Sequence, residues 1–345
     1  MWLDIAKGIA IICTIIGHTA TPIGRIIYSF HMPIFFILAG YTLKTISTKD
    51  MAKATLKDFK RLVIPVFVVL LVQIPLEMFF EDFSLKTCLK NILIVALWGA
   101  DFANRKEFGF LWFLLALFYA KFFFRLLLVY VKNYREIFIL FGTFIMVAAD
   151  IHMPQSIDLL FPAAFFLDIG YILKNGFSIS DDGMPKKLLP QEYMKIAGII
   201  GFFLWIYMSW TKGIAINLAA RSYPLSMLCF LVAFFGSFCI IQFSKALEQF
   251  HAIIRKPLIF FGKNSLELLC VHNLDRFFFK YWHHNLVHQD SFNEFLRARL
   301  NADNINMGLN CLFRILFCTA ILVVFILAKK TLQKIILTGK VHRRA

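Results

Sequence analysis

Apolar runs of membrane-crossing length recur along the chain, and they limit its possible folds more than any other feature. The first two cover residues 3–20 and 26–43 and flank a short loop that contains Pro22 and Gly24. A helix of about 20 apolar residues crosses roughly 30 Å of hydrocarbon. The chain is also 59% hydrophobic, well above an ordinary soluble domain. The sequence therefore predicts an all-α polytopic integral membrane protein.

The apolar runs predict about ten transmembrane helices within a single transmembrane domain, residues 1–345. Polar connections that are rich in Lys, Arg, Gly or Pro separate them. We expect the spans at about residues 3–20, 26–43, 62–80, 109–131, 137–150, 157–174, 196–212, 222–243, 258–278 and 309–328.

The basic residues predict the orientation of these spans. The formal net charge is +16, and the charges fall in short segments between the apolar runs. Such segments hold no soluble basic domain, so we expect no nucleic-acid partner. With a cytoplasmic N-terminus, Lys and Arg favour the inner segments by about two to one. We therefore expect a multi-pass protein of the inner or plasma membrane, with both termini cytoplasmic.

Residues 85–100 do not fit this alternation. The stretch is short for a crossing, and its first turns carry Lys86 and Lys90. A crossing here would place the basic C-terminal tail outside. We expect an amphipathic helix that lies at the outer interface of the bilayer.

A polar stripe runs along the first span, which is otherwise mostly Ile, Ala and Gly; its residues are Asp4, Lys7, Thr14 and His18. Eleven residues separate Lys7 from His18, which places them within roughly 20° on the helix and about 16 Å apart along its axis. A charge near the bilayer centre costs roughly 2.5 to 3.5 kcal/mol, so such groups face a partner or a cavity. Two interpretations stay open: a salt bridge with a buried structural histidine, or an active-site face.

Several stretches resemble the membrane-bound acyltransferase 3 family, especially its branch similar to fucose 4-O-acetylases. They are DIAKGIAIICTIIGH, FHMPIFFILAGYTLK and KDFKRLVIP, with weaker similarity in FLWFLLALF and FFGKNSLELLCVHN. The family has a basic residue and a histidine in its first span, which Lys7 and His18 match. It also has a basic motif before the third span, often Arg-x-x-Arg. Lysines replace at least one arginine here, where the motif corresponds to Lys57, Lys60 and Arg61.

The resemblance implies an enzyme that moves an acetyl group from cytoplasmic acetyl-CoA to a hydroxyl of a glycan or lipid-linked sugar. His18 would act as general base or as a transient acyl carrier, because histidine as a residue type has an unperturbed pKa near neutrality and can pass a proton both ways. Lys7 and Asp4 would orient it. Cationic and amide groups would bind the donor, and the candidates are Lys57, Lys60, Arg61, Arg125, Lys263 and Asn264. Simple positive-inside anchoring remains an alternative for the basic motif.

Further residues are candidates for substrate contact or support. His31 precedes Pro33 and either donates in the site or supports a kink. His272 and Asn273 match a later family motif, and Trp112 either anchors at the interface or stacks on sugar. Arg125 and Asp168 are expected to pair, because neither can face lipid.

The seven cysteines lack metal-ligand spacing. The predicted outer loop at residues 279–308 holds His283, His284 and His288, with no Cys or carboxylate at ligand spacing nearby, so we expect no metal site.

Two other functional classes compete with an acyltransferase. A secondary transporter would also bury charges, but it predicts repeat symmetry and interrupted helices in both halves, which the sequence does not clearly show. A glycan exporter or scaffold without acyl chemistry does not explain so many costly intramembrane charges. The sequence does not determine the oligomeric state or which sugar is modified.

Overall fold

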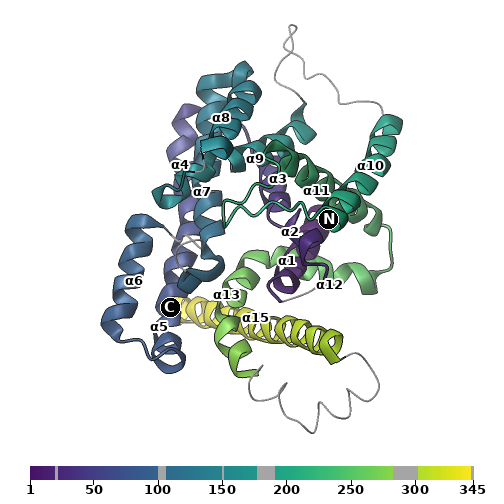
Figure 1. Cartoon of the computed structure of the whole chain (residues 1–345). Helices are drawn as coiled ribbons and strands as arrows, with labels where there is room; N and C mark the ends of the chain where they lie inside the picture. The colour runs from purple at the N-terminus through teal and green to yellow at the C-terminus, as the bar shows by residue number, and fades with distance from the viewer. Residues whose placement is uncertain (20–21, 100–105, 150, 177–190, 283–301, 343–345) are drawn as a thin grey trace. The chain divides into compact units, whose positions relative to one another are not determined.

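The structure is a computed structural model that describes residues 1–19, 22–99, 106–149, 151–176, 191–282 and 302–342 (Figure 1). The described part is predominantly helical, with one isolated β-bridge between Asn217 and Ser222. Its contacts divide the chain into two compact units, Met1–Lys263 and Asn264–Ala345. The all-α prediction is confirmed for the residues described.

The first unit contains a series of α-helices with short 3-10 and π turns between them. They are α1 (Trp2–Gly17), α2 (Gly24–Tyr28), α3 (Pro33–Thr42), α4 (Thr48–Asp58), η1 (Phe59–Val63), α5 (Ile64–Phe80), α6 (Leu85–Trp98), η2 (Lys106–Leu111), α7 (Trp112–Leu126), η3 (Leu127–Val131), η4 (Lys132–Tyr134), α8 (Arg135–Ala149), η5 (Pro154–Leu159), α9 (Leu160–Asn175), α10 (Gln191–Ile206), η6 (Tyr207–Thr211), α11 (Met227–Leu247) and α12 (Ala252–Lys263).

The second unit contains α13 (Ser265–Trp282) and α15 (Ala302–His342), which pack against each other.

Among the described residues, five helical segments are long and apolar enough to cross a membrane. All ten predicted spans are largely helical, but the number of crossings and the position of the termini remain predictions. The five segments are Thr48–Phe80, Gly109–Ala149, Pro154–Asn175, Met227–Leu247 and Gly308–Thr331.

Two predicted spans are each broken into two helices. The range 26–43 divides into α2 and α3, with Pro33 at the first position of α3. Proline has no N–H to continue the preceding helix, but it is favoured at the start of a new one. The range 258–278 divides at Asn264, whose carbonyl accepts the first bond of α13, from Leu268 N at 2.8 Å. The kink expected at Pro33 is a full break between two helices, and the break at Asn264 was not predicted.

Glycines allow two antiparallel helix pairs in the first unit to approach closely. A Cβ at Gly8 of α1 would overlap the Leu258 carbonyl of α12, and one at Gly262 would overlap the Asp4 carbonyl. The same holds for α3 and α9, where Gly40 lies against Leu167 and Gly170 against Ile37. Small residues at such contacts bring backbones together, which is how helices associate in lipid. The first half of α1 is therefore placed by direct backbone packing on α12.

The predicted interfacial segment is helix α6. Ser84 caps it by accepting a hydrogen bond from Thr87 N at 3.2 Å, and Cys88 and Val95 are buried on one face. Leucines cover the opposite, exposed face: Leu85, Leu89, Leu93 and Leu97. A helix in this place is confirmed, and its location at the bilayer surface remains a prediction.

Replacing Gly170 by Ala should destabilise the protein, because the new methyl group would overlap the carbonyl of Ile37. Overpacking of this kind costs about 1 to 3 kcal/mol. We expect a lower midpoint of thermal unfolding for Gly170→Ala in detergent. Gly198→Ala on α10 is the matched control, since its methyl group would meet only a ring atom of Phe238 at 3.5 Å. Equal midpoints for the two variants would contradict the proposed close contact.

Candidate active site

The N-terminal end of α1 lies beside the ends of α3 and α11. The terminal amine is 3.5 Å from the Glu248 carboxylate. The Trp2 ring lies 5.1 Å from Tyr41 of α3, and Lys245 of α11 lies 5.3 Å above it. These are the ends that the charge pattern predicts to be cytoplasmic, so the structure brings together ends that were assigned to one side.

Asp58, at the end of α4, holds two cations of α7. Its Oδ1 is 2.5 Å from Lys121 Nζ, and its Oδ2 is 2.5 Å from Arg125 Nη2. The predicted pair of Arg125 with Asp168 is therefore wrong. Asp168 instead binds Arg135 of α8, with Arg135 Nε donating at 2.8 Å.

Lys7 and Arg61 extend this group into a cationic cluster. The Lys7 ammonium interacts electrostatically with Asp4 and Arg61, and the Lys121 ammonium with Arg61 and Arg125. Residues of α1, α4, η1 and α7 thus bring four cations and two carboxylates within electrostatic range of one another. We call this the cationic cluster: Lys7, Arg61, Lys121, Arg125, Asp4 and Asp58.

Arg125 has spare hydrogen-bond donors within this cluster. Its side chain is 9% exposed, yet Nε and Nη1 have no hydrogen-bond partner among the described residues. A buried guanidinium that leaves donors unused is costly unless a further acceptor binds there. The cluster can therefore accept an anionic ligand.

The other predicted donor-binding residues lie around this end. Lys57 and Lys60 are exposed on α4 and η1, on either side of buried Asp58. Lys263 is exposed at the end of α12 and follows Gly262, which packs on the Asp4 carbonyl. Asn264 begins the second unit, so it is not placed relative to the cluster.

His18 caps the opposite end of α1 and lies in an aromatic group. Its ring stacks on Phe110 with centroids 3.7 Å apart. Tyr28 and His31 approach it edge-on at 6.2 and 6.3 Å, and they lie 5.0 Å from each other. The structure therefore brings together the two histidines that the sequence singled out in the first 31 residues.

His31 is buried, and its Nδ1 donates to the Ile27 carbonyl at 2.9 Å. This bond supports the break between α2 and α3. Pro33 has no N–H for the carbonyl of Ser29, four residues earlier, but the His31 ring bonds to Ile27 and not to Ser29. Trp112 is also buried, at 4% exposure, and its ring lies 6.1 Å from Phe113. The interfacial-anchor interpretation of Trp112 is therefore wrong, because an anchor would contact the lipid surface.

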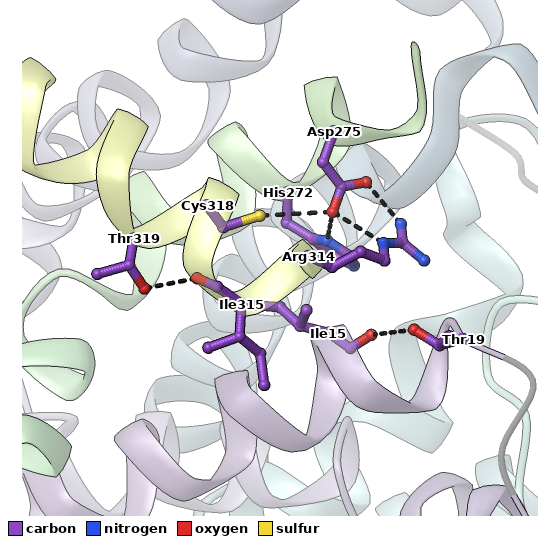
Figure 2. A network of polar contacts seen from close by, with 8 residues as sticks. All are labelled: Ile15, Thr19, His272, Asp275, Arg314, Ile315, Cys318 and Thr319. Atoms are coloured by element: carbon purple, nitrogen blue, oxygen red, sulfur yellow. Dashed lines mark hydrogen bonds and ion pairs between the residues drawn. The ribbon is translucent and has the colours of Figure 1, made fainter. Parts of the chain in front are cut away.

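The second unit contains a buried polar cluster that joins α13 to α15 (Figure 2). His272 Nδ1 is 2.6 Å from Asp275 Oδ2, and Arg314 binds both carboxylate oxygens, at 3.0 and 2.5 Å. The Cys318 thiol donates to Asp275 Oδ2 at 3.4 Å. Asn273 is buried beside His272. Sequence reasoning missed Asp275, although its spacing from His272 indicates one helical face.

The donor types in this cluster are those that bind zinc. His272 Nδ1, a carboxylate oxygen of Asp275 and Cys318 Sγ lie within 4.8 Å of one another. Arg314, however, already neutralises the carboxylate and would repel a divalent cation there. The arrangement fits a fixed histidine better than a metal centre.

Comparison with known proteins adds the family. A protein-family model described as an acyltransferase domain matches residues 1–329. The chain belongs to the acyltransferase 3 family. As a member of the acyltransferase 3 family it is an acyltransferase, and the match covers nearly the whole chain, including both units. No curated protein and no solved structure matches it significantly.

Asp58→Asn should strongly destabilise the protein, because it leaves Lys121 and Arg125 buried without a carboxylate. Breaking a buried ion pair costs about 3 to 5 kcal/mol. We expect a marked fall in the thermal unfolding midpoint in detergent. Asp50→Asn, on the same helix and exposed, should change it little. Equal midpoints for these two variants would mean that Asp58 is not the partner of the two cations.

Proposed function

We propose that this acyltransferase moves an acetyl group from cytoplasmic acetyl-CoA to a hydroxyl of a cell-surface or exported glycan, or of its lipid-linked precursor. The observation that carries the proposal is that α1 holds the cationic cluster near its start and His18 at its end. At 1.5 Å per residue these two groups lie about 16 Å apart along the helix. A donor with anionic phosphates at one end of a long arm and a thioester at the other matches such a separation.

The cationic cluster is the proposed phosphate site of acetyl-CoA. Arg61 and the spare donors of Arg125 supply charge-assisted hydrogen bonds, which are stronger than neutral ones. Exposed Lys57, Lys60 and Lys263 add positive charge around the entrance. Asn264, the first residue of the second unit, stays a proposed donor contact on the sequence motif alone.

His18 is the proposed base. In the direct route, the acceptor oxygen bonds to the acetyl carbonyl carbon while the His18 imidazole takes the hydroxyl proton. The carbon–sulfur bond then breaks, and the imidazolium returns its proton to the departing thiolate. In the second route the imidazole nitrogen bonds to the acetyl carbon as the carbon–sulfur bond breaks and the thiolate leaves. The acceptor oxygen then takes the acetyl group as the carbon–nitrogen bond breaks, and its hydroxyl proton passes to the released thiolate. Both routes need an imidazole at this position.

Supporting roles follow from position. Lys7 and Asp4 lie on the helix that carries His18, and their proposed role is to orient it. His31 is the second imidazole beside His18, and buried Trp112, next to Phe113, is kept as a proposed secondary residue. In the second unit, His272 with Asn273 are the proposed secondary residues, with Asp275 fixing the ring of His272.

His18→Ala should abolish acetyl transfer, because loss of a general base lowers rates by about 10² to 10⁴. The measurement is the O-acetyl content of surface glycan in a deletion strain complemented with each variant at matched membrane expression. His152→Ala is the control, since His152 is exposed and lies outside the aromatic group. Acetylation restored equally by both variants would leave His18 a structural residue. Unchanged acetylation with the wild type would remove the proposed function itself.

Arg61→Gln should weaken donor binding more than it slows the chemical step. A hydrogen bond to a charged group contributes about 1.5 to 3 kcal/mol, so the KM for acetyl-CoA should rise at least about tenfold. The kcat should change much less. Lys49→Gln, an exposed change on α4, is the charge-matched control. An unchanged KM in Arg61→Gln would place the phosphate site elsewhere.

A further inference from the structure

A pocket opens beside the His18 end of α1, wholly within the first unit. Its volume is about 420 Å³, which falls in the range of small-molecule sites. It is formed by the end of α1, by α2, and by the segment that follows η6. Its lining residues are Gly17, Thr19, Gly24, Arg25, Tyr28, Ala215 and Asn217.

The pocket adjoins the proposed base. Gly17 and Thr19 flank His18 in the chain, and the Tyr28 ring that lines the pocket lies edge-on to the His18 ring at 6.2 Å. Thr19 donates its hydroxyl proton to the Ile15 carbonyl at 3.4 Å, which leaves its oxygen as an acceptor (Figure 2). A ligand in this pocket would therefore lie next to the aromatic group.

The wall made by residues 214–222 is rigidly held. Ile214, Ile216 and Leu218 are buried, and the alternation of an extended chain turns Ala215 and Asn217 to the other side. Two backbone bonds of 3.0 Å between Asn217 and Ser222 close the turn.

Arg221 anchors this wall to η5, the turn that precedes α9. Its Nε donates to Asp158 Oδ2 at 2.6 Å, and its Nη2 donates to Ser156 Oγ at 3.3 Å. Arg221 adopts a φ of +51°, a conformation that non-glycine residues rarely take. Such strain persists only where the surroundings enforce it, so the pocket is shaped before any ligand arrives.

The polar side chains around the pocket are chiefly donors. Arg25 is exposed, and its guanidinium has no hydrogen bond or ion pair among the described residues; a Cβ at Gly213 would lie 3.5 Å from its Nη1. Asn217 Oδ1 accepts a bond from Ala220 N at 3.1 Å, so its amide donors remain. None of the described lining residues is Asp or Glu. Because the lining offers the Arg25 cation and the Asn217 amide donors but no carboxylate, it favours binding of an anion with several hydrogen-bond acceptors.

We propose that this pocket binds the anionic group of the acyl acceptor, a carboxylate or a phosphate, with Arg25 as its specificity residue. The proposal rests on the proposed function only in naming the ligand as the acceptor. It narrows the acceptor from any glycan hydroxyl to one on an acidic sugar or on a sugar phosphate. Recognition of the charge beside His18 would hold a nearby hydroxyl in reach of the imidazole.

The test compares three probes on purified full-length protein without acetyl-CoA: methyl β-glucuronide, glucose 1-phosphate and neutral methyl β-glucoside. Binding is measured by calorimetry. We expect at least one charged probe to bind about tenfold or more tightly than the glucoside, as a charge-assisted bond provides. Tighter binding of the glucuronide would identify the acceptor's anionic group as a carboxylate. Tighter binding of glucose 1-phosphate would identify it as a phosphate.

Arg25 variants decide whether the pocket is responsible. Arg25→Gln should remove the preference and leave glucoside binding unchanged. Arg25→Lys should retain more phosphate than carboxylate binding, because Lys is a point charge and lacks the bidentate fork. Lys86→Gln, an exposed change on α6, is the control and should behave as wild type. The inference fails if charged probes bind no better than the glucoside, or if their preference survives Arg25→Gln.

A parallel transfer assay separates this inference from the proposed function. The assay measures transfer from radiolabelled acetyl-CoA to charged and neutral acceptors. Transfer without preference for charged acceptors would refute the anion pocket and support the proposed acetyltransferase function. Arg25-dependent binding of a charged probe without any acetyl transfer would support the anion pocket and refute acetyl-CoA as the donor.

Discussion

The close packing of α1 on α12 is the contact on which the candidate site depends. Backbone meets backbone where Gly8 faces Leu258 and Gly262 faces Asp4. Lipid tails give helices no hydrophobic reason to associate, so this approach gains its energy from dispersion contacts that larger side chains would prevent. Because α1 is one regular helix, fixing it near its start also fixes its far end. The placement of His18 is therefore determined partly by glycines more than two turns away.

Buried carboxylates tie the remaining helices together. Each of four Asp residues is paired with an Arg that belongs to a different helix or segment, which removes the cost of an isolated charge. An ion pair between elements has one correct geometry, whereas apolar contacts among Phe and Leu residues tolerate sliding. The pairs therefore specify which helices are neighbours. The pairs are Asp58 with Arg125, Asp158 with Arg221, Asp168 with Arg135, and Asp275 with Arg314.

The sequence predicted the relative positions of residues on the same helix, but not which residues of different helices form pairs. Lys7 and His18 could be placed on one face because helical geometry alone relates them. Arg125 was assigned the wrong carboxylate, because nothing in the spacing says that α7 lies against α4. The family was recognisable from short motifs, and the match over residues 1–329 confirms it. The break at Pro33 was visible as a kink signal, but not as a full separation of α2 from α3.

The two ends of α1 differ in how their surroundings are built, and this difference suits two kinds of ligand. The cationic cluster sits on helical elements, whose positions follow from packing. Around the pocket near His18, by contrast, Gln155, Ser156 and Arg221 take positive φ values, each costing about 1 to 3 kcal/mol. A wall of irregular backbone, fixed by contacts such as that of Arg221 with Asp158, presents a shape that a regular helix cannot offer. A common donor bound on helices and a particular acceptor bound against loops would divide the work of a transferase in this way.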